Sequence, residues 1–164
     1  MKRYSRKDQR IMATWAANCA ERVLPLFERA RSEDGRPRNA IQVCREWVET
    51  EVFRMADIRR ASLDAHAAAR AAKADHEAAC FAARAAGQAV ATAHVPQHAF
   101  GGSYYALKAL AASDREHVET AAAAEREWQA QQLPADLKQE FLVRVVIEKR
   151  RTGIFVTVRK DGDF

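Results

Sequence analysis

Two histidines stand four residues apart in TAHVPQHAFGGSYYALKA, the stretch that spans residues 92–109. On one helix face, His94 and His98 could together hold a zinc ion. A zinc site needs a third and usually a fourth ligand, and no other histidine, cysteine or carboxylate stands at a diagnostic spacing. Pro96 lies between the two histidines, and proline favours the first turn of a new helix. We therefore predict no metal site, with His94 ending one helix and His98 entering the next.

The same stretch places four polar side chains where a helix could turn them toward one cleft. His98, Tyr105 and Lys108 share one side of the expected helix, and His94 can join them across the corner at Pro96. Such a set could bind an anion or move a proton. We favour a polar surface on which the side chains bury their apolar parts and keep their polar ends in water, because no carboxylate pair or nucleophile stands nearby. We assign no catalytic residue and no cofactor, and we keep the four as a candidate polar cluster.

Two other patterns could suggest chemistry. Gly101 and Gly102 form no G-x-G-x-x-G motif and no strand precedes them, so we expect the pair to admit a neighbouring helix and not a phosphate. Cys80 follows His76 by one helical turn, and a thiol beside an imidazole can act as a nucleophile. A buried structural cysteine is far commoner, so we interpret Cys80 as a core residue.

Alanine dominates the segments that must position these side chains. The chain of 164 residues contains 35 alanines and only four prolines, and alanine is the best helix former. The first predicted helix runs from Asp8 to Arg31, with Pro25 expected to kink or restart it. Its buried side is a stripe with one apolar residue every four positions: Ile11, Trp15, Cys19, Val23 and Phe27.

Further helices follow from the same periodicity and from turn signals. A carboxylate cap at Asp57 and a capping box of Ser113 with Glu116 are expected to start two of them. The last segment, GIFVTVRKDGDF, alternates like a strand, but its partner strand is not visible in the sequence. The predicted helices after the first span residues 37–53, 57–72, 75–94, 97–112, 113–131 and 134–150.

These elements predict one all-α domain over residues 1–164, an irregular bundle or a stack of helical hairpins with six or seven helices and a short extended C-terminal tail. The basic charge lies at the ends, in a lead at residues 1–10 and a tail at residues 144–164, whereas the body between them is slightly acidic. Basic ends could bind nucleic acid, but no named DNA-reading motif is present, so we disfavour that function. The sequence leaves open whether the protein forms a homo-oligomer.

Composition also bounds the location of the protein. No apolar run approaches the roughly 20 residues that a membrane span requires. No apolar stretch follows the basic N-terminus, so we expect no signal peptide. The three cysteines are odd in number and far apart, which is typical of reduced thiols and not of a disulfide framework. We therefore expect a cytoplasmic protein without a membrane partner.

Several stretches resemble one known family. WAANCAERVLPLFE at 15–28, RPRNAIQVCREWV at 36–48 and AHAAARAA at 65–72 are followed by the long block ARAAGQAVATAHVPQHAFGGSYYALKA at 83–109 and by EREWQAQQLPADLKQEFL at 125–142. In order and spacing they resemble the bacterial putative immunity protein family that is associated with polymorphic toxin systems. The resemblance covers residues 15–143, and the segment from 144 onward departs from it.

The resemblance implies an all-helical bacterial protein that is no enzyme and that neutralises a cognate toxin by binding it. It implies no catalytic residue. The family-like positions are Trp15, Arg36, Pro37, Trp47, His94, His98, Tyr105 and Lys108, and the first four are expected to be structural. Immunity proteins against nucleases are often acidic, to match a basic active site. Because this chain is basic at both ends, either its toxin is of another kind or the acidic body makes the contact.

Overall fold

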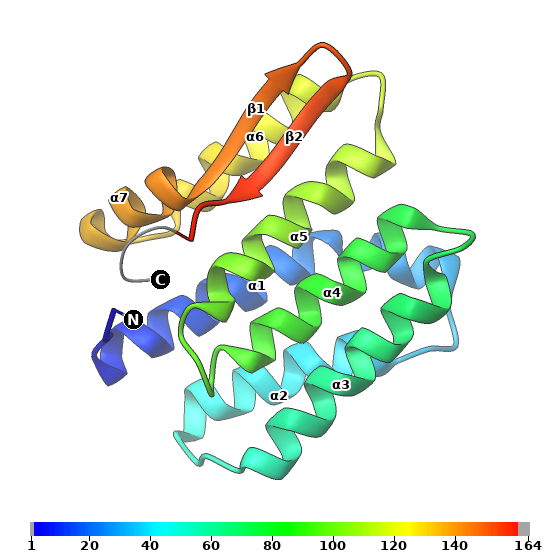
Figure 1. Ribbon diagram of the computed structural model, residues 1–164. Coiled ribbons are helices and arrows are strands. Elements are labelled where there is room, and N and C mark those ends of the chain that lie inside the picture. Colours follow the sequence, from blue (N-terminus) through cyan, green and yellow to red (C-terminus); the bar gives the residue numbers. More distant parts are fainter. Residues whose placement is uncertain (1, 161–164) are drawn as a thin grey trace.

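The computed structural model describes residues 2–160, which form a helical body with a β-hairpin attached near its C-terminal end (Figure 1). The elements, in chain order, are α1 (Arg6–Ala30), α2 (Arg36–Thr50), α3 (Met55–Ala72), α4 (Glu77–Ala91), α5 (His98–Ser113), α6 (Val118–Gln131), α7 (Ala135–Arg144), β1 (Val145–Arg150) and β2 (Gly153–Val158). Over these residues, the prediction of a mostly α-helical fold with a short extended C-terminal segment is confirmed.

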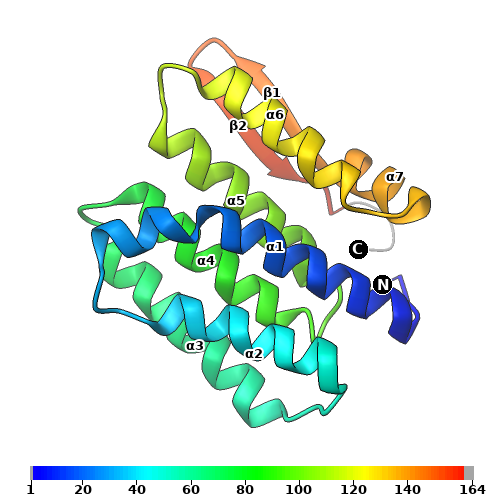
Figure 2. The same cartoon turned by 180° about the vertical axis from the view of Figure 1, so that it is seen from behind.

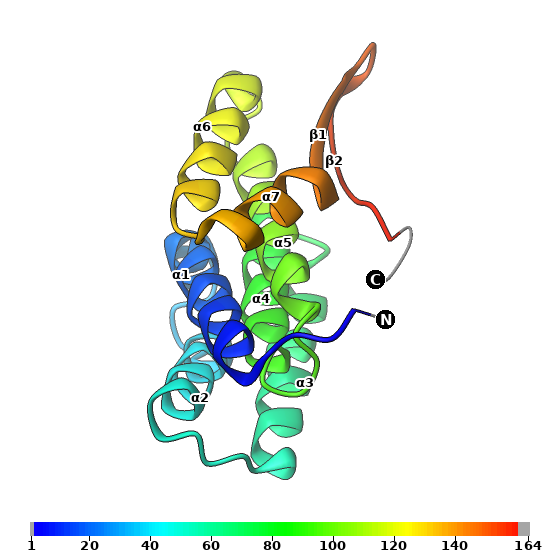
Figure 3. The same cartoon turned by 90° about the vertical axis from the view of Figure 1, so that its left-hand side faces the viewer.

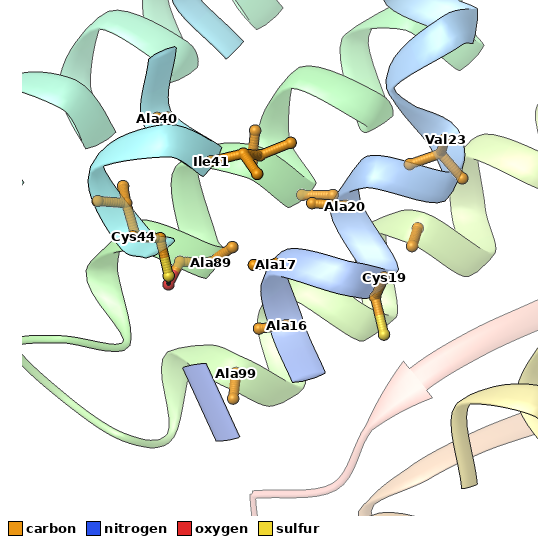
Figure 4. Packing of buried hydrophobic residues seen from close by; sticks show 14 of the residues in the cluster. Ala16, Ala17, Cys19, Ala20, Val23, Ala40, Ile41, Cys44, Ala89 and Ala99 are labelled. Carbon is orange, nitrogen blue, oxygen red and sulfur yellow. Dashed lines mark hydrogen bonds between the residues drawn. The ribbon is translucent and has the colours of Figure 1, made fainter. Parts of the chain in front are cut away.

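Helix α4 lies at the centre of the body and packs against α1, α2, α3 and α5 (Figures 1 and 2). Its sequence, EAACFAARAAGQAVA, places small side chains on several faces, which lets neighbouring helix axes approach closely. Figure 4 shows Ile41 of α2 beside Ala20 of α1, and Cys44 of α2 turned toward Ala89 of α4. The Cys44 thiol lies 3.3 Å from the carbonyl oxygen of Ala89. Alanine thus sets the spacing of the bundle.

Aromatic rings supply the bulk that alanine lacks. Trp15 of α1 packs edge-on against Phe100 of α5 and Phe141 of α7, with ring centroids 6.1 Å and 5.1 Å apart. The Trp15 indole N–H donates to the backbone oxygen of Gln129 at 2.9 Å. All four side chains are buried. This cluster holds α6 and α7 against α1 and α5.

A buried polar chain joins α6 to the same two helices. The Ser103 hydroxyl of α5 donates to the side-chain oxygen of Gln129, whose amide N–H₂ donates to Glu125. Glu125 then accepts a bidentate pair from Arg22 of α1. Because Glu125 and Gln129 are buried, each needs these partners to offset its loss of water.

The hairpin lies on the opposite side of α5 from α1 (Figure 3). Its strands pair antiparallel, with Val145 opposite Val158 and Ile147 opposite Val156. Val145 is buried, and the other three residues of these two pairs are partly buried against the core. The opposite face of the hairpin carries Phe155, which is exposed. One face of the two-stranded sheet therefore rests on the body.

The hairpin corrects the prediction for the C-terminal end. The predicted helix at 134–150 ends at Arg144, and residues 145–150 form the strand β1. Val145, Val146 and Ile147 fit a helical stripe, but these β-branched residues also favour a strand. Pairing with β2 decides between the two. The partner strand of β2, which the sequence did not reveal, is thus β1, the segment directly before the turn at residues 151–152.

Two further expectations about helix ends are wrong, and a third is narrowed. Ser113 belongs to α5 and its hydroxyl donates to the Leu110 oxygen, so it forms no capping box; α6 begins only at Val118. Asp57 lies inside the first turn of α3, whose N-cap is Arg54. Helix α1 continues through Pro25, which excludes the restart, while the kink at Pro25 stays a prediction. Packing of an apolar face outweighs these local signals.

Among the described residues, no helix combines the length and the apolarity that crossing a bilayer would demand.

Candidate functional site

A groove runs along β2, between this strand and the helices α4 and α5. It consists of two hollows with volumes of about 510 Å³ and 410 Å³, which share Val156. The first lies beside the start of α5 and the second beside its end. We call the two together the β2 groove. Its lining residues are Glu77, Phe81, Gln88, Val95, Gln97, His98, Gly101, Tyr104, Tyr105, Lys108, Ala111, Ala112, Arg115, Val118, residues 152–158 and Lys160.

His98 lines the groove at the first residue of α5 and is half-buried. Its Nδ1 lies 2.7 Å from the side-chain oxygen Oε1 of Gln88 on α4. An amide oxygen can only accept, so the Nδ1–H donates and Nε2 is left as an acceptor in the neutral ring. Burial lowers the pKa of His98 below its ordinary value, and the charges of His94 and Lys160 lower it further. The imidazole is therefore neutral at physiological pH.

A second histidine lies nearby on the other side of α4. His66 of α3 packs against Gly87, where a Cβ atom would come within 2.9 Å of the His66 Nε2. Burial lowers the pKa of His66 as well, and the charges of Arg84, Arg70 and His98 lower it further. Within residues 2–160, no group of three His, Cys, Asp or Glu side chains is placed to hold a metal ion.

Tyr105 occupies the middle of the groove wall. Its hydroxyl accepts a hydrogen bond from the Arg84 guanidinium at 3.2 Å, and its ring stacks on Phe81 with centroids 6.2 Å apart. Tyr104 packs edge-on against it at 4.9 Å. Lys108 follows one turn later, with its Nζ 4.4 Å from the Phe81 centroid and 5.4 Å from the Tyr104 centroid. The lysine charge therefore lies over aromatic faces.

The structure brings three of the four residues of the candidate polar cluster to one groove. His98 and Tyr105 line the first hollow and Lys108 lines the second. His94 lies in the turn between α4 and α5, is exposed, and lines neither hollow. The expected shared side of the helix is therefore present for His98, Tyr105 and Lys108, whereas the corner at Pro96 turns His94 away.

The sequence interpretation missed the half of the site that α4 and β2 provide. Phe81, Arg84 and Gln88 are spaced three and four residues apart, which places them on one face of α4. They are the large side chains in an otherwise alanine-rich helix, and this was the available signal. No local pattern, however, pairs this face with α5, so the contacts to His98 and Tyr105 depend on tertiary packing.

The family-like positions Arg36, Pro37 and Trp47 lie in α2, outside the groove. Arg36, the first residue of α2, forms an ion pair with Asp34 at 2.6 Å, and Pro37 is buried in the first turn of that helix. The guanidinium next to Asp34 holds the pKa of that carboxyl below its usual range. Trp47 is buried in α2 beneath the guanidinium of Arg6, which lies 5.0 Å from its ring.

The glycine and cysteine expectations are also settled by packing. A Cβ on Gly102 would lie 3.3 Å from the Ala16 Cβ of α1, so this glycine permits the close approach of two helices. Cys19, Cys44 and Cys80 are free and buried, and His76 is exposed. Burial raises the pKa of Cys44 to about 12 and that of Cys19 well above its ordinary value. Neither of these two is a ready nucleophile.

Fold and groove together define a mostly helical protein in which the groove residues His98, Tyr105 and Lys108 contact side chains of α4 and α5. Residues 2–136 match the sequence model of a family described as Imm-5 like putative immunity protein, and the chain belongs to this family. A search of curated proteins and a search of solved structures each return no match. The matched segment ends within α7, so the hairpin lies beyond it.

Proposed function

We propose that the protein is a non-enzymatic immunity protein that binds a cognate bacterial toxin and blocks it by occlusion. The observation that carries this proposal is the match of residues 2–136 to the immunity family. Because the hairpin lies beyond the matched segment, it is the part best suited to recognise a partner that is particular to this chain.

The contacts inside the β2 groove favour a binder over an enzyme. The Nδ1–H of His98 donates to Gln88, the Tyr105 hydroxyl accepts from Arg84, and Lys108 lies over two aromatic rings. Tyr105 and Lys108 would have to leave these partners before they could transfer a proton or attack a substrate. The Nε2 of His98 can accept a proton, but among the described residues no carboxylate or thiol lines the hollow beside it. A binding surface, in contrast, benefits from side chains that are held in place before the partner arrives.

The composition of the groove also suits a protein partner. Tyrosine, phenylalanine and arginine are enriched in the cores of protein interfaces, and the groove walls contain Phe81, Tyr104, Tyr105 and Arg115. Phe155 adds an exposed ring on the outer face of β2. We infer that this side of the molecule meets the toxin.

The test is protection against the toxin encoded beside the gene. The purified chain is expected to bind that toxin directly, and its co-expression is expected to restore growth. Tyr105→Ala and Lys108→Glu should each weaken binding about tenfold or more, as for residues at the centre of an interface. Arg59→Glu, a charge reversal at an exposed position of α3, is the matched control and should bind like the wild type. A chain that neither binds nor protects would remove the proposal.

The proposal places the protein in the bacterial cytoplasm. Three free, buried cysteines are typical of a reducing compartment.

Nucleic acid is the rival partner, because the hairpin is basic. We expect no measurable DNA or RNA affinity at about 50 mM salt, where phosphate contacts would be strong. Tight binding of DNA or RNA at this salt concentration, falling steeply as salt is added, would favour nucleic-acid binding as the function instead.

A further inference from the structure

The hydrogen-bond register of the hairpin determines which backbone groups of β2 point outward. The N–H of Arg159 donates to the Arg144 oxygen at 2.8 Å, so this pair is hydrogen-bonded. In an antiparallel ladder such pairs alternate with non-bonded ones. Counting along the observed register, Gly153, Phe155 and Thr157 face β1 with their backbone groups. The N–H and C=O groups of Ile154, Val156 and Val158 therefore point away from β1, along the other edge of β2.

This edge is open along the whole strand. Within residues 2–160, no hydrogen bond joins the outward groups of Ile154, Val156 and Val158 to another part of the chain. Both hollows of the β2 groove border the strand on this side. The edge of β1 differs, because the Arg126 guanidinium of α6 donates to the outward oxygen of Val145 at 2.8 Å.

We propose that the open edge of β2 binds an extended, acidic segment of the partner protein, which adds to the sheet as a third strand inside the β2 groove. That the partner is a toxin rests on the function proposed above. In strand addition, main-chain hydrogen bonds supply affinity and alternate side chains enter pockets. Here one set of side chains would face Phe81, Tyr105 and Lys108, and the other set would face solvent.

Charge decides the character of this segment. Residues 144–160 carry six basic side chains against one acidic side chain, Glu148, and two of the six pair with carboxylates outside this segment: Arg144 with Glu140 and Lys149 with Glu119. Lys108 adds positive charge to the groove floor, where Arg115 is paired with Glu77 at 3.3 Å. An acidic strand is attracted by this arrangement, whereas the hairpin of a second copy would be repelled. A partner segment, and not a second copy, is therefore the occupant.

The first test uses a peptide as long as β2, with alternating valine and glutamate. Hydrogen exchange of the full-length chain is followed by NMR as the peptide is added up to about 1 mM, a range that detects weak binding. The amides of Ile154, Val156 and Val158 are expected to slow about tenfold or more, as new hydrogen bonds form. The same peptide N-methylated on alternate residues, and a valine–lysine peptide, should have no effect. Unchanged exchange, or equal binding of the N-methylated peptide, would overturn strand addition.

The second test uses two prolines at matched positions. Val156→Pro removes an outward N–H from the open edge, and Ile147→Pro removes one from the edge of β1 directly opposite. Proline is tolerated at such edge positions, and both variants lose a similar aliphatic side chain. Val156→Pro should lower peptide affinity about tenfold or more, and Ile147→Pro less than about twofold. Equal affinity of the two variants would contradict the proposal.

The two proposals fail separately. If the chain protects cells from its toxin but the peptide does not slow exchange of the three outward amides, strand addition is wrong and the proposed immunity function still stands. Slowed amides with the acidic peptide, together with no protection against any neighbouring toxin, support the strand site and remove the toxin as its occupant.

Discussion

The Nδ1 of His98 lies 2.7 Å from the side-chain oxygen of Gln88, and this contact ties the start of α5 to the end of α4. It depends on the absence of a side chain at Gly101, where a Cβ would lie 2.6 Å from the same oxygen. The glycine thus permits a helix-to-helix hydrogen bond at the wall of the β2 groove. The consequence for the imidazole is a fixed tautomer with Nε2 free to accept from a partner.

The two half-buried histidines, His66 and His98, predict a loss of stability in mild acid. Burial lowers the pKa of His98 and of His66 in the folded state, so the unfolded chain takes up these protons first as the pH falls. The free energy of unfolding should therefore decrease as the pH drops below the ordinary value of 6.5, and level off below the folded-state pKa values. Urea denaturation at pH 7.5 and 5.5 measures the difference, each pH chosen to be about one unit from the ordinary value.

The control for this prediction is a set of glutamine variants. The double variant His66→Gln with His98→Gln should lose most of the pH dependence, while His94→Gln, at an exposed position, should keep it. A double variant as sensitive to acid as the wild type would assign the effect to other groups.

The two neighbouring glycines of α5 should differ in how strongly the fold responds to their substitution. At Gly102, Cβ would be 3.3 Å from the Ala16 Cβ and 3.6 Å from the Ala85 carbonyl oxygen, so Gly102→Leu must push α1 or α4 away. We expect it to destabilise the fold by about 1–3 kcal/mol. Gly101→Ala displaces the flexible end of Gln88 and removes its hydrogen bond to His98, a loss of about 0.5–1.5 kcal/mol that offsets a gain in helix propensity of up to about 1 kcal/mol, so we expect little net change. Thermal denaturation of both variants measures the difference. A Gly101→Ala variant less stable than Gly102→Leu would contradict the prediction.

Two prolines in helices provide a matched pair of predictions. Pro25 is exposed in the interior of α1 and removes the bond to the Glu21 carbonyl, so Pro25→Ala should raise the free energy of unfolding by about 1–3 kcal/mol. Pro37 is buried in the first turn of α2, where proline costs nothing. Pro37→Ala should therefore lower stability by about 1 kcal/mol. Urea denaturation compares them, and a destabilised Pro25→Ala would mean that the ring itself is needed.

The ion pair of Arg22 and Glu125 should be asymmetric in its effect. The Glu125 side chain is 3% exposed and the Arg22 side chain 45% exposed, so Arg22→Met strands a buried carboxylate. We expect a loss of about 1–3 kcal/mol, below the value for a fully buried pair because solvent screens the arginine. Adding Glu125→Gln should recover part of it, since the amide still meets Gln129. Denaturant unfolding of the single and double variants measures the coupling energy between Arg22 and Glu125. If the changes in the free energy of unfolding simply add, the two residues are not coupled.

Local signals determined the helical fold and the polar face of α5. Alanine content and apolar stripes every three or four residues specify helices without reference to distant parts of the chain. The spacing of His98, Tyr105 and Lys108 alone placed them on one side of a helix. The sequence therefore established this side of the candidate site, and also its aromatic and basic character.

Tertiary structure decided what meets that face. Gln88 and Arg84 reach His98 and Tyr105 only because α4 packs beside α5. Val145, Val146 and Ile147 satisfy both a helical and a strand pattern, and the pairing with β2 resolves the ambiguity in favour of a strand. Strand pairing is a contact between two segments, so its energy is absent from either segment read by itself. For this reason the helices follow from the chain's local preferences, while the β2 groove exists only in the folded molecule.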